Sequence, residues 1–135
     1  MHGMVNVVTG DLVRTLRPRG RGDDVAAAVA ALAQRAGPGP TLLVWDNAPP
    51  HHTRVARQAA ADGHIELAWL PFRSPELNPC EDIWRRLKAT VAANRAYPSV
   101  DDLADRASAW FDTRSPHDFL RYAGLTSSKF AWLLT

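Results

Sequence analysis

The sequence predicts an α/β fold, a mixed sheet flanked by helices with extra C-terminal helices, and three observations support this prediction. Short apolar runs closed by turn residues alternate with longer segments whose apolar residues recur at helical spacing. The apolar run at 41–46 ends abruptly in Asp46 and then breaks at the turn residues 47–50. A second carboxylate, Glu81, follows a Pro-rich loop and falls in the first turn of a predicted helix. Such an order of strand and helix patterns is typical of α/β domains.

The sequence of the first part of the chain predicts a hairpin followed by a helix. Residues 2–8 and 12–17 favour strands, and Thr9-Gly10-Asp11 between them is turn chemistry. Asp23 or Asp24 is then expected to cap a helix. Its inner face is predicted to hold Val25, Val29, Leu32 and Ala36, and Gly37-Pro38-Gly39-Pro40 ends it.

The remaining elements follow from the same two periodicities. Residues 41–46 form a buried strand, and a helix from about 52 to 62 is stopped by Gly63. Residues 64–70 alternate as a strand does. Beyond the loop at 71–79, helices are predicted at 80–94, 99–113 and 115–124, the last two opened by Ser99 and Ser115.

The helix at 80–94 brings an acid close to its apolar face. Successive residues turn by about 100°, so the apolar residues fall within an arc of roughly 100°. These residues are Cys80, Ile83, Trp84, Leu87 and Val91. Glu81 projects about 60° beyond the Trp84 edge of that arc. A carboxylate at this rim is expected to be partly buried and still to reach a cation.

Composition restricts the class of protein. A length of 135 residues, 46% hydrophobic content and five Trp describe one folded domain. No apolar run could span a bilayer, and the lone Cys80, which has no internal disulfide partner, fits a reducing cytoplasm. The net charge is only +2 although the pI is about 9.1. The cations gather in two clusters, Arg14, Arg17, Arg19 and Arg21, and Arg85, Arg86 and Lys88. Both suit contact with phosphates, although a solvated surface explains them as well.

Two motifs resemble a known family. Residues 46–51 read Asp-Asn-Ala-Pro-x-His, and residues 74–88 read Ser-Pro-Glu-Leu-Asn-Pro-x-Glu-x-x-Trp-x-x-Leu-Lys. Together they resemble the DDE superfamily of Tc/mariner-like insertion-sequence transposases, in which 34 intervening residues, here 47 to 80, are usual. The resemblance covers nearly the whole chain, including the ending at 123–130. The family's first catalytic Asp is expected upstream of residue 1.

The resemblance implies a ribonuclease H-like mixed sheet that lacks its first, central strand. Residues 1–135 would then form a partial DDE catalytic domain, with a core at 1–95 and a C-terminal helical part at 96–135. A gap is expected between the strand at 41–46 and the hairpin, unless the sheet closes without the missing strand.

The resemblance also implies the chemistry of the site. Asp46 and Glu81 would be catalytic and would bind Mg²⁺ or Mn²⁺, because hard cations prefer oxygen ligands. Site support would come from Asn47, His51 and Asn78. Contacts with DNA would come from Arg17, Arg19, Arg21, Arg85 and Lys88.

Each of these residues has a simpler explanation. Asp-Asn before Pro is ordinary turn chemistry, and Glu81 could merely complement a helix dipole. Asp82 is expected to be a surface residue rather than a ligand. His51 could be a histidine at a helix start without a catalytic role, and Lys88 could face solvent.

Three functions remain open. The chain could be a truncated transposase, inactive alone, or the downstream part of a split reading frame joined to an upstream portion that supplies the missing Asp. It could also be a non-enzymatic remnant that binds DNA or a transposase subunit. The expected partners are the insertion-sequence ends, target DNA, and a second copy or the upstream portion, in the cytoplasm and without a membrane.

Overall fold

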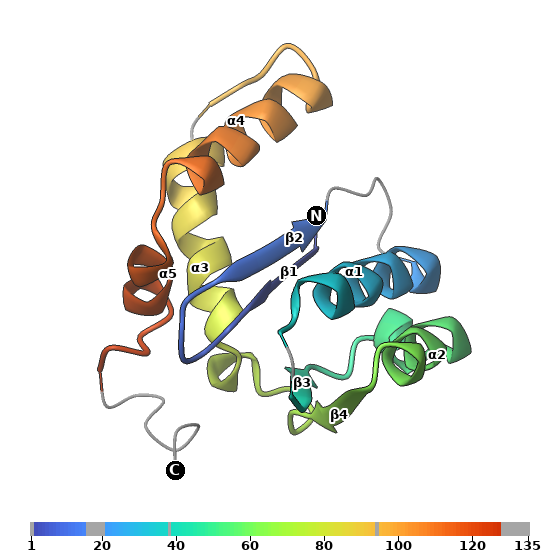
Figure 1. Ribbon diagram of the computed structural model, residues 1–135. Helices are drawn as coiled ribbons and strands as arrows, with labels where there is room; N and C mark the ends of the chain where they lie inside the picture. The colour runs from blue at the N-terminus through green and yellow to red at the C-terminus, as the bar shows by residue number, and fades with distance from the viewer. Residues whose placement is uncertain (1, 16–20, 38, 94, 128–135) are drawn as a thin grey trace. The chain divides into compact units, whose positions relative to one another are not determined.

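The computed structural model describes residues 2–15, 21–37, 39–93 and 95–127. These residues form two compact units. Unit 1 holds the residues up to Met4 together with Leu12–Asn78, and unit 2 holds Val5–Asp11 together with the residues from Pro79 onward. Strands and helices alternate between residues 12 and 87, and further helices follow, which confirms an α/β fold (Figure 1).

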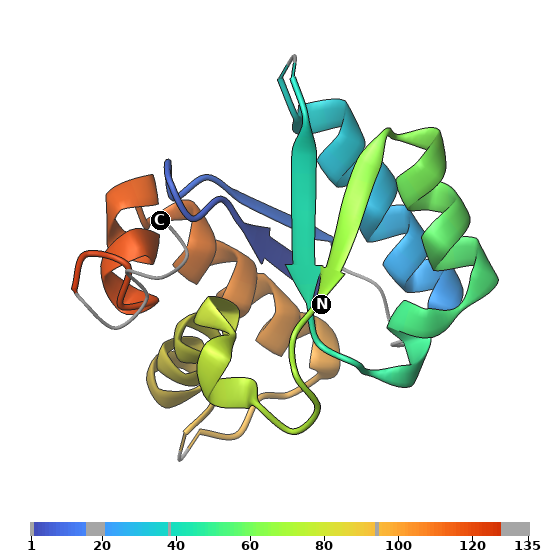
Figure 2. The ribbon, with the colours of Figure 1, turned by 90° about the horizontal axis from the view of Figure 1, so that it is seen from below.

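Unit 1 contains two pairs of strands and two helices. β1 (His2–Val5) pairs with β2 (Leu12–Thr15), and β3 (Thr41–Trp45) pairs in parallel with β4 (Ile65–Trp69). The parallel register aligns Thr41 with Ile65 and Trp45 with Trp69. Helices α1 (Gly22–Arg35) and α2 (Arg54–Asp62) lie beside each other on one side of the β3–β4 pair (Figure 2).

The core of unit 1 lies between this helix pair and the strands. Its buried members are Val25, Val29, Leu43, Trp45, Ala56, Ala60 and Ile65. β3 alternates, because Leu43 and Trp45 point into the core whereas Leu42 and Val44 remain 60% and 41% exposed. Met4 of β1 packs against the same core. The hairpin and β3 therefore share one apolar cluster.

The sequence predicts one mixed sheet, but the described strands form two separate pairs. Within the described residues, β3 has a ladder only with β4, and the hairpin has none with β3. A ribonuclease H-like arrangement stays a prediction. Packing on shared helices thus brings the two pairs into one unit without backbone pairing between them.

Two predicted helix boundaries in unit 1 are wrong for local reasons. α1 begins at Gly22, and neither Asp23 nor Asp24 is its N-cap; the Asp24 carboxylate instead accepts a hydrogen bond from the Arg21 backbone N–H, at 3.3 Å. The helix predicted at 52–62 is split into a 3₁₀ turn, η1 (Pro49–His52), and α2. Thr53 separates them, because its hydroxyl accepts a hydrogen bond from the Ala56 N–H and caps α2.

Unit 2 is largely helical. α3 (Pro79–Leu87) continues into a π-helical turn, η3 (Lys88–Ala92), and is followed by α4 (Val100–Asp112) and α5 (Pro116–Tyr122). The predicted caps Ser99 and Ser115 are confirmed, since each hydroxyl accepts a hydrogen bond from a backbone N–H in the first turn. The unit buries Ile83, Val91, Ala107, Trp110, Phe111, Phe119 and Ala123.

The hairpin turn belongs to unit 2 and lies against α5. Gly10 has a φ of +80°, and a Cβ on it would lie 2.0 Å from the Pro116 carbonyl oxygen. Only glycine fits both constraints. The predictions for residues 16–17, Arg19 and 128–130 fall outside the described residues. Among those that are described, no helix combines the length and the apolar character needed to cross a bilayer.

Candidate active site

Asp46 follows the last residue of β3, at the carboxyl end of a parallel strand pair. Its Oδ1 accepts a hydrogen bond from the Ala48 N–H at 3.0 Å. This contact closes the turn that an Asp-Asn pair predicts. The Asp46 side chain is 45% exposed, so the carboxylate is fixed by the turn and is still open to a ligand.

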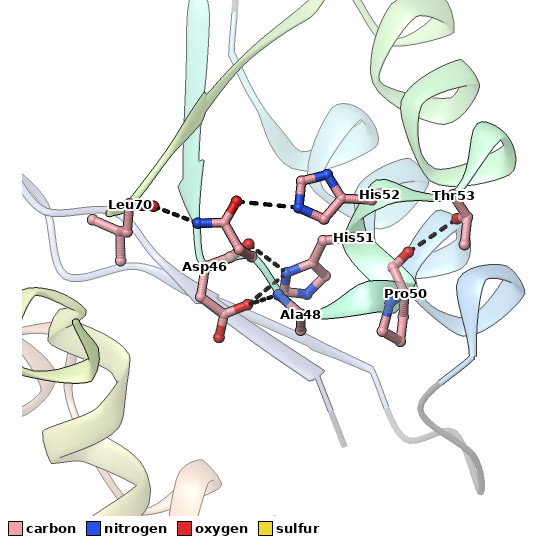
Figure 3. Close-up of polar contacts among 8 residues, drawn as sticks. Asp46, Ala48, Pro50, His51, His52, Thr53 and Leu70 are labelled. Carbon is pink, nitrogen blue, oxygen red and sulfur yellow. Dashed lines mark hydrogen bonds and ion pairs between the residues drawn. The ribbon is translucent and has the colours of Figure 1, made fainter. Parts of the chain in front are cut away.

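His51 returns to Asp46 from the 3₁₀ turn η1. Its Nδ1 lies 2.8 Å from Oδ1 of Asp46 and 3.1 Å from the Asp46 carbonyl oxygen (Figure 3). The imidazole is 20% exposed. The contact is compatible with support of Asp46 and with a purely structural role at the start of η1, so site support by His51 stays a prediction.

Asn47 and His52 repeat this arrangement one residue later. Asn47 Nδ2 donates to the Leu70 carbonyl, just beyond β4, and its Oδ1 lies 3.1 Å from His52 Nε2. His52 Nδ1 in turn lies 3.3 Å from Nη2 of Arg57 on α2. The residues of each pair, 46 with 51 and 47 with 52, are five positions apart. Asn47 therefore ties the end of β3 to the end of β4.

Two tryptophans support the two imidazoles. His51 stacks on Trp45 with ring centroids 4.6 Å apart and planes 5° apart, and His52 stacks on Trp69 at 4.2 Å and 7°. Trp45 and Trp69 are register partners in the parallel pair, with their own centroids 5.2 Å apart. The last residues of both strands thus form an aromatic surface on which the two imidazoles stack.

Glu81 lies in the first turn of α3, where the sequence places it, and it is half-buried. The neighbouring Asp82, expected at the surface, is partly buried: its side chain is 17% exposed and lies 2.7 Å from the exposed Arg85 guanidinium. This ion pair spans one helical turn. That Asp82 is not the metal ligand stays a prediction. The convergence of Asp46 and Glu81 on one cation stays a prediction.

The other predicted site residues have mixed surroundings. Asn78 is half-buried between the 3₁₀ turn η2 (Pro75–Leu77) and α3, and its backbone N–H donates to the Pro75 carbonyl at 3.0 Å. Arg21 and Lys88 are exposed, as contact with DNA requires. Arg85 is 76% exposed, but its charge is partly neutralised by Asp82. Arg17 and Arg19 lie outside the described residues.

The chemistry of the donors suits a hard divalent cation. Asp46 and Glu81 offer carboxylate oxygens, the ligands that Mg²⁺ and Mn²⁺ prefer. Within the described part of the chain, no three His, Cys, Asp or Glu side chains gather closely enough to hold a metal ion. Both histidine rings next to Asp46 are already engaged, one by Asp46 and the other by Asn47 and Arg57.

Sequence reasoning missed three contributors to the site. In the sequence, Trp45 and Trp69 look like ordinary apolar residues of two strands, and His52 belongs to neither motif. The sequence shows a Trp near the end of each of the two predicted strands, but only the register of the parallel pair places both indoles at one edge. A histidine pair shortly after one of these strands is then within reach of both rings.

Comparison with known proteins now identifies the family. The model of the DDE superfamily endonuclease family matches residues 1–104, which include Asp46, Glu81 and both motifs. The chain therefore belongs to the DDE superfamily of endonucleases. The resemblance that the two motifs indicate is confirmed at this level.

One curated relative also matches. The chain is 34% identical over 70 residues to an uncharacterized protein, y4pE/y4sA, of Sinorhizobium fredii. The match covers 51% of this chain and 50% of the relative, so the chain spans about half the length of the relative it matches. No solved structure matches the chain.

Proposed function

We propose that this chain is the downstream part of the catalytic domain of a Tc/mariner-like insertion-sequence transposase. It would contribute to metal-dependent cleavage of a DNA strand and to transfer of the freed 3′-hydroxyl to target DNA. The observation that carries the proposal is Asp46, held at the carboxyl end of a parallel strand with one oxygen fixed and its side chain 45% exposed. Ligands of α/β proteins collect at this edge of the sheet.

The residues would divide the work as follows. Asp46 and Glu81 would hold Mg²⁺ or Mn²⁺, which when bound supplies activation of the attacking oxygen and charge stabilisation for the leaving oxygen. Asn47 would keep the ends of β3 and β4 together through Leu70. Asn78 would fix the start of α3 and hence the position of Glu81. Arg21, Arg85 and Lys88, with Arg17 and Arg19, would neutralise DNA phosphates.

The exposed face of β3 in unit 1 supports the proposal that a further portion of protein binds there. Within the described residues β3 pairs only with β4, and Leu42 and Val44 are exposed although parallel strands are normally covered on both faces. A preceding segment that supplies a further strand and the first Asp, and that also packs on this face, would cover them. We propose a reducing cytoplasm as the compartment and a dimer as the working state.

The test is a cleavage assay. The chain is co-expressed with the segment encoded directly upstream, and nicking of supercoiled plasmid is measured with and without Mg²⁺. We expect Mg²⁺-dependent nicking that falls to background in Asp46→Asn and in Glu81→Gln. Asp82→Asn is the matched control, because Asp82 pairs with Arg85 and should leave nicking intact.

Two outcomes would contradict the proposal. Nicking that survives in both Asp46→Asn and Glu81→Gln would remove these acids from the chemistry. Robust nicking by the isolated chain, without any added segment, would show that no further Asp is required.

A non-enzymatic remnant is the second candidate, and the exposed apolar face of β3 is the observation that favours it. Such a remnant would bind a transposase subunit and interfere with transposition. Interference that is unchanged in Asp46→Asn, with no nicking under any condition, would support this candidate over the enzyme.

A further inference from the structure

Oδ1 of Asp46 has two hydrogen-bonding neighbours. It accepts from the Ala48 N–H at 3.0 Å and lies 2.8 Å from Nδ1 of His51. The same Nδ1 lies 3.1 Å from the Asp46 carbonyl oxygen, which is also an acceptor. Because both neighbours of Nδ1 are acceptors, the proton of a neutral His51 is assigned to Nδ1.

The ring of His51 is held in this orientation by the fold rather than by Asp46 alone. Its plane lies 5° from that of Trp45, which is itself only 7% exposed. His52 is held on Trp69 in the same way, yet its Nε2 contacts Asn47 instead of Asp46. Each histidine is therefore held by a tryptophan, but His51 contacts Asp46 whereas His52 contacts Asn47.

We infer that His51 is a positioning residue, which fixes the Asp46 carboxylate so that Oδ2 alone faces a divalent cation. This inference rests on the proposed function, since it concerns the same acid. Among the described residues, Oδ2 of Asp46 has no hydrogen-bond partner, while Oδ1 has two. A cation bound through both oxygens would have to displace the Ala48 and His51 contacts. Partners that orient a ligand in this way commonly change metal affinity by about 10–100-fold.

The first test reads the tautomer of His51 without any metal. Long-range proton–nitrogen correlation spectra of the full chain at pH 8 are expected to show His51 protonated at Nδ1. In Asp46→Asn this preference should weaken. A His51 protonated at Nε2 in the unsubstituted chain would overturn the inference.

The second test separates the hydrogen bond from the stacking. Mn²⁺ affinity is measured by calorimetry on the full chain and its variants. His51→Phe keeps a ring for Trp45 but removes the donor, and it should weaken Mn²⁺ binding about tenfold. His51→Asn places an amide near the Nδ1 position and should stay within about threefold of the unsubstituted chain. His52→Phe is the matched comparison, because it keeps a ring for Trp69 and removes a contact with Asn47 rather than with Asp46; it should weaken Mn²⁺ binding less than His51→Phe does.

The outcomes distinguish this inference from the proposed function. Mn²⁺ binding that is lost in Asp46→Asn but unchanged in His51→Phe would overturn the positioning role and leave the proposed function standing. Equal weakening in His51→Phe and His52→Phe would also overturn it, because general loosening of the turn would then explain the effect. No Mn²⁺ binding by the unsubstituted chain, with the tautomer as expected, would overturn the cation role of His51 in this chain and would leave standing the proposed function, in which an upstream segment supplies the first Asp.

Discussion

Cys80, the first residue after Pro79 in α3, shows how its surroundings set the chemistry of one side chain. Burial, reinforced by the charge of Glu81 and opposed by a backbone hydrogen bond at Val5, raises the pKa of the Cys80 thiol from 9.0 to about 11. The thiolate is the reactive form, so this thiol is inert near neutral pH. Cys80 therefore acts as an apolar member of the α3 face.

The raised pKa of Cys80 predicts a loss of stability in alkali. The unfolded chain releases the thiol proton near pH 9, whereas the folded chain holds it until about pH 11. The contribution of Cys80 is fully present below pH 9 and is lost between pH 9 and 11, on the order of 2 kcal/mol. Urea unfolding at pH 8, 9, 10 and 11 measures it. Cys80→Ala should show a smaller decline across this range, and an identical decline would contradict the assignment.

At the site, the sequence predicted the turn after β3 better than the aromatic residues around it, while the catalytic roles of the acids stay a prediction. Asp46, Asn47 and His51 stand in a motif, and the structure places all three in one hydrogen-bonded turn. Trp45 and Trp69 could not be assigned, because their role depends on a strand register that joins residues far apart in sequence. Local chemistry was therefore predictable, whereas stacking across strands was not.

At the scale of elements, Thr53 organises the segment that carries both histidines. Its hydroxyl donates to the Pro50 carbonyl at 2.9 Å and accepts from the Ala56 N–H at 3.3 Å, so it joins η1 to α2. A Cβ on Gly22 would lie 2.6 Å from this hydroxyl oxygen. The start of α1 therefore lies close against the junction and leaves it little room to move.

Removal of the Thr53 hydroxyl should loosen this junction. Thr53→Ala is expected to lower the free energy of unfolding by about 1 kcal/mol, the usual effect of losing an N-cap. Thr53→Ala should also weaken the preference of His51 for the tautomer protonated at Nδ1, because the Pro50 carbonyl of η1 would lose its hydrogen bond from Thr53. Thermal unfolding and the imidazole nitrogen spectra measure the two effects, and Thr53→Ser should preserve both properties.

Ser99→Ala supplies the matched control for Thr53. Ser99 caps α4 in unit 2 with the same chemistry, so its loss should lower stability by a similar amount. The His51 spectrum should not change in this variant. If both substitutions altered that spectrum equally, the link between Thr53 and the histidine turn would be refuted.

Most element positions were predictable from the sequence, because their signals are local. Ser99, Ser115 and Gly63 mark helix ends in the sequence, and the structure uses all three. Three signals were misread: neither Asp23 nor Asp24 is the N-cap of α1, Thr53 was a cap inside a predicted helix, and α3 changes to a π-helical turn at Lys88. Nothing in the local composition of residues 88–92 marks that change.

At the scale of the whole molecule, the prediction of a single sheet was the one that local signals could not support. Strand pairing is decided by packing between distant segments, and here the described strands join only in pairs. The chain passes between the units three times, after Met4 and after Asp11 within the hairpin, and again after Asn78.

The uncovered face of β3 leads to the last prediction, which concerns the partner portion in the proposed function. Leu42 is 60% exposed, so Leu42→Asp should change the stability of the isolated chain by less than about 0.5 kcal/mol. If an upstream segment covers this face, the same substitution would bury an unpaired charge and should abolish co-purification of that segment. Val8→Asp is the control, because Val8 is 71% exposed on the hairpin turn of unit 2 and should leave co-purification unchanged. Co-purification of the segment with Leu42→Asp at the level of the unsubstituted chain would mean that the partner binds elsewhere.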